Sequence, residues 1–212
     1  MQAEVLDPPR NLGNIATQQL APCQAQKSGK APTLILMAGF AGAGKTTLAK
    51  SLSRRLRLEI LNKDELKLKR LAKGEEEEQA GWNAFEELMQ QIEEKVIKQK
   101  ESVIIDTSNE KPFIYENVQQ LVEQLRGMQI NAQLHVILCK LNKELRTERL
   151  NKRGSVFAPY IQTLPEILDD TELSDRFKHL PADKVVVVNT RAPLKTYKRK
   201  VLKCLNTSNE EI

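Results

Sequence analysis

The strongest constraint on the fold is a short apolar run followed at once by a glycine-rich segment, LILMAGFAGAGKTTLAK at residues 34–50. The apolar part, residues 34–37, is too short to span a membrane and is typical of a strand buried on both faces of a sheet. Residues 39–46 then match G-x-x-x-x-G-K-[ST] at every fixed position. The pattern predicts a strand, a phosphate-binding loop (P-loop) and a helix in direct succession.

The chemistry of this loop follows from its backbone. Glycines permit positive φ, so successive N–H groups can turn inward and form a cup for anionic oxygens, next to the positive end of a helix that begins near Lys45. We expect Lys45 to reach the β- and γ-phosphates of a nucleotide and the hydroxyl of Thr46 to bind Mg²⁺. A glycine-rich turn with a lysine there by chance would not need this order of strand, loop and helix. The predicted nucleotide contacts are Gly39, Phe40, Ala41, Gly42, Ala43, Gly44, Lys45, Thr46 and Thr47.

The chain of 212 residues has the length of one α/β domain. Residues 1–31 are rich in Gln, Ala, Pro and Gly and are expected to form a flexible leader, residues 32–206 the P-loop domain, and residues 207–212 a disordered tail. After the first strand, further strands are expected at 56–62, 102–106, 132–141 and 183–190, with helices between them. The helical stretch 63–100 is interrupted near Gly74 and Gly81. This alternation predicts a three-layer fold with a parallel sheet between helices.

Composition narrows the class of protein. The net charge of +5 is compatible with a polyanionic partner, although an ATP cleft alone would justify it. Three widely spaced cysteines without a C-x-x-C pair argue against a disulfide framework or a zinc site. The first residues lack the apolar core of a signal peptide, and no later stretch is long and apolar enough for a bilayer. We therefore expect a cytoplasmic protein without a membrane partner, and the sequence leaves its oligomeric state open.

Asp64 is the first candidate for chemistry beyond nucleotide binding. It follows the second expected strand, at the sheet edge where open α/β folds bind ligands. A carboxylate at this place can accept or orient the proton of a substrate hydroxyl. The alternative is that Asp64 caps the helix beginning ELKLKR, although a reciprocal capping box would need Glu or Gln where Lys67 stands.

Asp106 ends the apolar run 103–105, which is the form of a Walker B carboxylate that holds Mg²⁺ directly or through water. A plain strand-end aspartate is the alternative. Guanine recognition by N-K-x-D is poorly supported, because Leu145 stands where the aspartate after Asn142 and Lys143 should be. The metal ligands expected from the sequence are thus Thr46 and Asp106.

Three arginines follow the fourth expected strand. Arg146, Arg149 and Arg153 fall within roughly 60° of one another on a helix, and such a stripe could lie over transferring phosphates as a lid. We favour Arg149 and Arg153 as catalytic; the alternative is a solvated basic face paired with Glu144 and Glu148. Arg191, after the last strand, is a candidate for stacking on the base of the nucleotide.

Four stretches in chain order carry a resemblance: the P-loop, ILNKDELK, VIIDTSN and ELRTERLNKRGS. Over residues 33–190 they resemble the AAA_33-type P-loop kinases, in particular the 5′-kinase domain of phage-type polynucleotide kinase, with zeta-toxin-like kinases as relatives. The resemblance implies an adenylate-kinase-like core with a helical lid, ATP and Mg²⁺ as ligands, Lys45 and Thr46 as phosphate and metal ligands, Asp64 as base, and Arg153 as lid arginine. In one respect the chain departs, since Lys67 stands where polynucleotide kinases tend to have an arginine for the 3′-phosphate of the substrate.

The function expected from these features is an ATP-dependent kinase that transfers the γ-phosphoryl group to a hydroxyl. Its acceptor is unidentified, and a polynucleotide 5′-hydroxyl or a small metabolite is compatible with the pattern. The basic stretches 194–203 and 54–57 would supply sequence-independent affinity for nucleic acid, or they are solvated faces. The alternative from another class is an ATP-gated binding module with incidental hydrolysis.

Overall fold

A computed structural model describes residues 31–107, 112–152 and 182–206. The leader expected over residues 1–31 lies outside the described residues except for Ala31, and so does the tail expected at 207–212. None of the described helices is long and apolar enough to cross a lipid bilayer.

Five parallel strands form one sheet in the order β2-β3-β1-β4-β5. They are β1 (Thr33–Ala38), β2 (Glu59–Asn62), β3 (Val103–Asp106), β4 (Gln133–Lys140) and β5 (Lys184–Asn189). Asp106 at the end of β3 is in register with Met37 of β1 on one side and with Asn62 of β2 on the other. The carboxyl ends of the three strands therefore meet at one place on the sheet edge.

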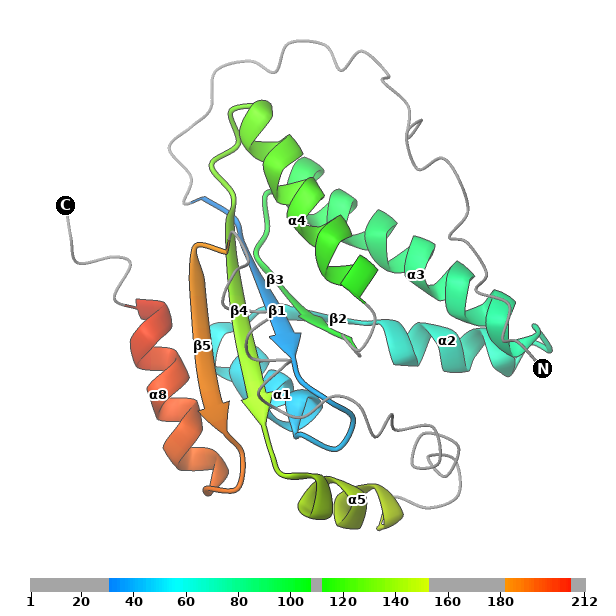
Figure 1. Ribbon diagram of the computed structural model, residues 1–212. Coiled ribbons are helices and arrows are strands. Elements are labelled where there is room, and N and C mark those ends of the chain that lie inside the picture. The colour runs from blue at the N-terminus through cyan, green and yellow to red at the C-terminus, as the bar shows by residue number, and fades with distance from the viewer. Residues whose placement is uncertain (1–30, 108–111, 153–181, 207–212) are drawn as a thin grey trace. The chain divides into compact units, whose positions relative to one another are not determined.

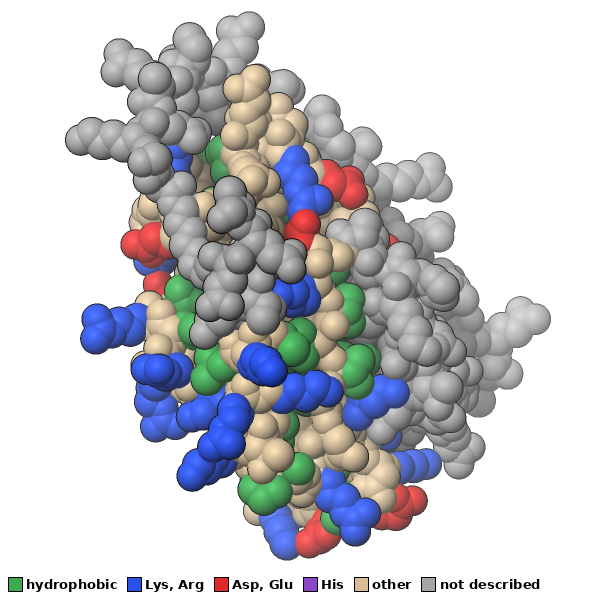
Figure 2. All heavy atoms as spheres, turned by 90° about the vertical axis from the view of Figure 1, so that its left-hand side faces the viewer, with side chains coloured by type: hydrophobic (Ala, Val, Ile, Leu, Met, Phe, Trp, Pro, Cys, Tyr) green, Lys and Arg blue, Asp and Glu red, His purple; other side chains and the backbone are tan. Residues whose placement is uncertain are grey.

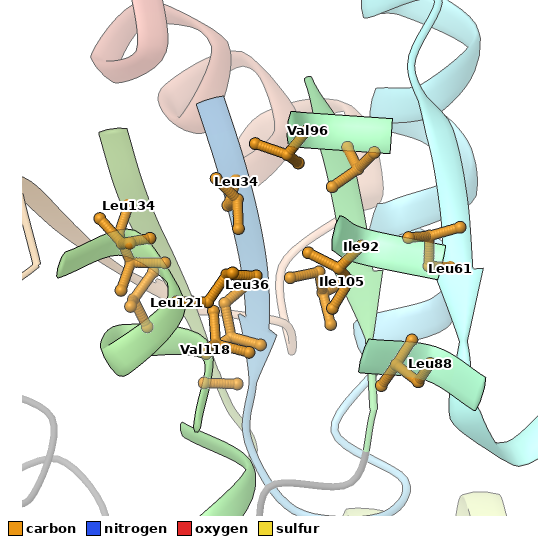
Figure 3. Close-up of a cluster of buried hydrophobic side chains, with 14 of the residues drawn as sticks. Leu34, Leu36, Leu61, Leu88, Ile92, Val96, Ile105, Val118, Leu121 and Leu134 are labelled. Atoms are coloured by element: carbon orange, nitrogen blue, oxygen red, sulfur yellow. The ribbon is translucent and has the colours of Figure 1, made fainter. Parts of the chain in front are cut away.

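Helices cover both faces of this sheet (Figure 1). They are α1 (Lys45–Leu56), α2 (Lys63–Leu71), α3 (Glu77–Glu93), the π-helical turn η1 (Glu94–Lys98), α4 (Pro112–Gly127), α5 (Lys143–Asn151) and α8 (Leu194–Asn206). The alternation of side chains along the strands divides the core in two. In β1, Leu34 and Leu36 pack toward α3, η1 and α4 (Figure 3), whereas Ile35 and Met37 pack toward α1 and α8.

The predicted α/β fold with a parallel sheet and helices on both faces is confirmed. The central strands β3, β1 and β4 are the most deeply buried, whereas the edge strands β2 and β5 also carry exposed residues. The second strand begins three residues later than expected, because α1 continues to Leu56 and ends at Arg57 in the left-handed conformation (φ 58°). The break near Gly74 is present, with φ 87°. The predicted break near Gly81 is wrong, because α3 continues through this residue and packs a regular apolar face on the core. The helical lid was expected on the stripe of Arg146, Arg149 and Arg153; the first two lie in α5, whereas Arg153 lies outside the described residues.

Candidate functional site

The P-loop connects β1 to α1 and turns tightly, with the N–H of Ala43 donating to the carbonyl oxygen of Phe40 at 3.1 Å. Two of its glycines are required by close packing as well as by positive φ. A Cβ on Gly39 would lie 2.4 Å from the carbonyl oxygen of Cys139 in β4, and one on Gly42 would lie 2.9 Å from the carbonyl oxygen of Arg146 in α5. The loop is therefore held between β4 and α5, and larger residues at these two positions would displace it.

Lys45 is the first residue of α1 and is buried. Its Nζ donates to the carbonyl oxygens of Gly39 at 2.7 Å and Phe40 at 3.0 Å, so the ammonium lies across the loop. The cap residue Gly44 offers no side-chain acceptor to the first turn of α1. The N-terminal N–H groups and the ammonium thus face one small region, which is the arrangement that binds phosphate.

Asp106 lies at the centre of the edge where β1, β2 and β3 end, and only 2% of its surface is exposed. It accepts hydrogen bonds from the hydroxyl of Thr46 and, at 3.2 Å, from Nδ2 of Asn62. Burial raises the pKa of Asp106 above its ordinary value, and the charges of Asp64 and Glu65 raise it further. The Thr46 hydrogen bond and the charge of Lys45 act in the opposite direction. The site therefore combines a buried acid with an adjacent ammonium.

Asp64 is exposed in the first turn of α2. The cap of this helix is Asn62, whose Oδ1 accepts from the N–H groups of Asp64 at 2.9 Å and Glu65 at 3.1 Å. The alternative in which Asp64 is itself the cap is therefore wrong, because the side chain of Asn62 takes that role. Both Asp64 and Glu65 act electrostatically on Asp106, which places the two acids at the same edge as the P-loop.

The three arginines of the predicted stripe have different outcomes. Arg146 is 5% exposed and lies over the ring of Phe40, with the guanidinium carbon 4.4 Å from the ring centroid. Arg149 donates from Nη2 to the carbonyl oxygen of Thr190 at 3.0 Å, and its Nη1 would be 3.4 Å from a Cβ on Gly44. Arg153 lies outside the described residues. The alternative of a solvated basic face is wrong for Arg146, which is buried.

The segment after β5 also touches the loop. The hydroxyl of Thr190 donates to the carbonyl oxygen of Ala43 at 2.7 Å, and Thr190 is buried. The next residue, Arg191, is exposed, and its N–H donates to Oδ1 of Asn189 at 2.9 Å. Arg149, Thr190 and the P-loop therefore form one contact region, with Arg191 at its border.

Sequence reasoning missed three residues of this arrangement: Asn62, Glu65 and Thr190. Asn62 joins α2 to Asp106, and its signal was its place directly before a helix with two acids in the first turn. Thr190 had no local signal, because its partner Ala43 is 147 residues away in the chain.

The oxygen atoms at this edge suit a hard divalent cation. The Thr46 hydroxyl and the Asp106 carboxylate are already adjacent, and Mg²⁺ prefers such ligands together with phosphate oxygens and water. Within the described ranges, no group of three or more His, Cys, Asp or Glu side chains could hold a metal by itself. A magnesium ion here would thus depend on the nucleotide for part of its coordination.

Comparison with known proteins places this geometry in context. The family model AAA_33, described as an AAA domain, matches residues 34–159. A shikimate kinase of Azobacteroides pseudotrichonymphae genomovar. CFP2 is 30% identical over 123 residues, which are 55% of this chain and 64% of that protein, so the match spans less than two thirds of the relative.

Two solved structures share the fold. A putative kinase from Chloroflexus aurantiacus J-10-fl has a TM-score of 0.60 at 20% identity and covers 85% of this chain and 99% of its own. A sugar kinase from Janibacter sp. HTCC2649 has a TM-score of 0.53 at 19% identity, covering 84% and 95% respectively. These likenesses show a common fold.

Proposed function

This chain belongs to the AAA_33 family, and from that membership we propose that it is an ATP- and Mg²⁺-dependent kinase that phosphorylates a hydroxyl group. The observation that carries the proposal is the meeting of Lys45, Thr46 and Asp106 with the exposed acid Asp64 at one sheet edge. A P-loop alone binds nucleotide. A solvent-exposed carboxylate on the neighbouring helix, at the same sheet edge as the phosphate cup, is what a transfer reaction requires in addition.

In the proposed reaction, the acceptor oxygen forms a bond to the γ-phosphorus while the bond from that phosphorus to the β-bridging oxygen breaks and ADP leaves. Asp64 takes the proton of the acceptor hydroxyl. Lys45 and the N–H groups of the P-loop hold the negative charge of the phosphates in position. Arg149 and Arg153 are assigned to the charge that develops on the transferred group, as arginines often are in such reactions.

The Mg²⁺ ion is assigned to Thr46 and Asp106, whose oxygens are adjacent. When bound, it supplies positive charge to the phosphate oxygens. The adenine is assigned to the region bordered by Arg149 and Arg191. Support comes from the contacts that join Arg149, Thr190 and Ala43, which place this segment directly beside the loop.

For the acceptor we propose a small hydroxyl-bearing metabolite. The similar proteins include a shikimate kinase and a sugar kinase, whose acceptors belong to this class. A polynucleotide 5′-hydroxyl is less favoured, because Lys67 is engaged by Glu77 of α3 at 2.8 Å instead of being offered to a 3′-phosphate. This ion pair between α2 and α3 puts a negative charge beside Lys67, where a 3′-phosphate would have to bind.

The test is transfer of labelled γ-phosphate from ATP to a panel of shikimate, sugars, nucleosides, aminoglycosides and 5′-hydroxyl oligonucleotides. Labelling of one small-molecule class supports the proposal. Labelling of oligonucleotides alone would replace the small metabolite by a polynucleotide. If ATP binds and no acceptor is labelled, the ATP-gated binding module is the better description, and a clear preference for GTP over ATP in competition would contradict the choice of nucleotide.

A further inference from the structure

Two basic segments that are far apart in the sequence lie together in the fold. Helices α1 and α8 pack against the same face of the sheet, where Leu48 and Leu52 of α1 share a core cluster with Tyr197 and Val201 of α8. Their outward positions carry basic side chains. We call this surface the α1–α8 basic face; it consists of Lys50, Arg54, Arg55 and Arg57, with Lys195, Lys198, Arg199, Lys200 and Lys203.

The basic face carries no neutralising acids of its own. Neither α1 nor α8 contains an aspartate or glutamate, and all members of the face are exposed except the half-buried Lys198. Within the described part of the chain, none of its side chains forms an ion pair. Figure 2, which views the molecule from the α8 side, shows these blue side chains gathered with little red between them.

On the other face of the sheet, helix α3 carries negative charge. Helix α3 contains five glutamates and no lysine or arginine, and two of them, Glu77 and Glu87, pair with Lys67 and Arg70 of α2. The net charge of +5 is therefore distributed unevenly, with α1 and α8 purely basic and acidic residues concentrated in α3. Such a separation creates a directional field that attracts an extended polyanion to one face only.

We propose that the α1–α8 basic face binds the phosphate backbone of double-stranded nucleic acid without reading its sequence. On α8, Lys195, Arg199 and Lys203 are spaced by four residues, so they follow one another at about 6 Å along the helix. This row matches a line of repeated charges better than it matches a single anion. No aromatic side chain of α1 or α8 is exposed for base stacking, since Tyr197 is buried, which favours duplex phosphates over single-stranded bases.

An anionic membrane is less favoured as the occupant. Interfacial helices need large apolar side chains at the contact. The large apolar side chains that are exposed in the described part are Leu68, Met128 and Val187, and none lies in α1 or α8. In β5, Val186 and Val188 belong to the cluster under α1 and α8, so Val187 between them points to the other face.

The residues of the face that are changed in the experiment below are separate from the candidate site. Arg54, Arg55 and Arg57 are at the C-terminal end of α1, just before β2 begins, whereas the P-loop and Asp106 are at the carboxyl ends of the strands. Duplex binding can therefore be measured without phosphoryl transfer. The inference stands whether or not the proposed kinase activity is correct.

The experiment measures binding of the full chain to a fluorescent 20-bp DNA duplex by anisotropy, over a series of salt concentrations. The variants R54Q/R55Q and R199Q/K203Q each remove two charges from the face. The matched control K69Q/K73Q removes two exposed charges from α2 and the turn that follows it. We expect each face variant to weaken binding at least about tenfold and to reduce the slope of log Kd against log salt by about 2. The control should change binding less than about twofold.

Three results would overturn the inference. The first is no measurable binding of the wild-type chain to duplex at low salt. The second is equal weakening by the control and face variants. The third is that duplex binding persists in the face variants while another interaction is lost. Loss of binding to phosphatidylserine vesicles would assign the face to a membrane, and loss of concentration-dependent self-association would assign it to α3 of a second copy. ATP affinity, measured in parallel, should be unchanged in every variant because none of these residues belongs to the P-loop region.

Discussion

The guanidinium of Arg146 is stacked on Phe40, 4.4 Å from the centroid of the ring, and it joins α5 directly to the P-loop. The side chain is nearly inaccessible, and among the described residues its Nε has no hydrogen-bond partner. Burying a charge is costly, and stacking on an aromatic face offsets only part of that cost. The arrangement is understandable if the positive charge serves an anion at the loop.

Replacing Arg146 with Met should therefore separate the effect of its charge on ATP binding from the effect of its packing on stability. Methionine keeps an unbranched apolar stem over Phe40 and removes the buried charge. We expect ATP to bind about 5- to 20-fold more weakly, as befits the loss of one nearby charge. The thermal midpoint should stay equal or rise. Calorimetric titration and a melting curve measure the two effects. A lower midpoint with normal ATP affinity would mean that Arg146 only supports the loop.

Two adjacent acids allow a matched test of the base. Asp64→Asn should lower kcat by about 10²- to 10⁴-fold with ATP affinity nearly intact, because a general base contributes this much. Glu65→Gln removes a neighbouring charge of the same sign and should lower kcat by less than about threefold. Steady-state kinetics and nucleotide titration measure both. A large loss of kcat in Glu65→Gln together with normal turnover in Asp64→Asn would mean that Glu65, and not Asp64, is the base.

Asn62 combines a helix cap with a contact to Asp106. Asn62→Ala should cost about 1 kcal/mol of stability through loss of the cap, which is a shift of about 2–4 °C in Tm for a domain of this size. It should also reduce turnover, because Asp106 loses a hydrogen-bond donor. Asn62→Ser restores a capping oxygen, so its Tm should recover while its turnover stays low. Full recovery of turnover in Asn62→Ser would show that only the cap matters.

Because the pKa of Asp106 is raised, we expect this side chain to make the stability of the protein depend on pH. Burial is the main cause, so the protonated form is favoured in the folded protein relative to the unfolded chain. The contribution of Asp106 to stability is therefore full below its unfolded pKa and is lost as pH rises through the folded value. Asp106→Asn should lower turnover at least about 100-fold through impaired metal binding, and its Tm advantage over wild type should grow as the pH rises above about 4, the ordinary pKa of an aspartate in an unfolded chain. Melting curves across this range would contradict the assignment if the advantage shrank.

Thr190 tests the connection between the segment after β5 and the P-loop. In Thr190→Val the carbonyl oxygen of Ala43 loses its donor, which costs about 1–3 kcal/mol for a buried group. We expect a lower Tm and weaker ATP binding, whereas Thr190→Ser keeps the hydroxyl and should bind ATP normally. Equal ATP affinity in Thr190→Val and wild type would remove this segment from the nucleotide site.

Local patterns were sufficient for much of the fold. The run ILM and the loop after it, the apolar strands and the basic last helix are each encoded within a few neighbouring residues, so their places were predictable. Gly81 shows the limit of such patterns. A glycine weakens a helix when considered alone, but packing of Ala80, Ala84 and Leu88 on the core holds α3 continuous through it.

By itself, the sequence determined the class of fold, the phosphate cup and the acids and arginines available for chemistry, because each depends on short-range backbone geometry and periodicity. Only the tertiary structure decided which of these groups meet. Asn62 reaches Asp106, Thr190 reaches Ala43, and the basic residues of α1 join those of α8. Such contacts depend on strand order and helix packing, which bring together residues that no local pattern connects.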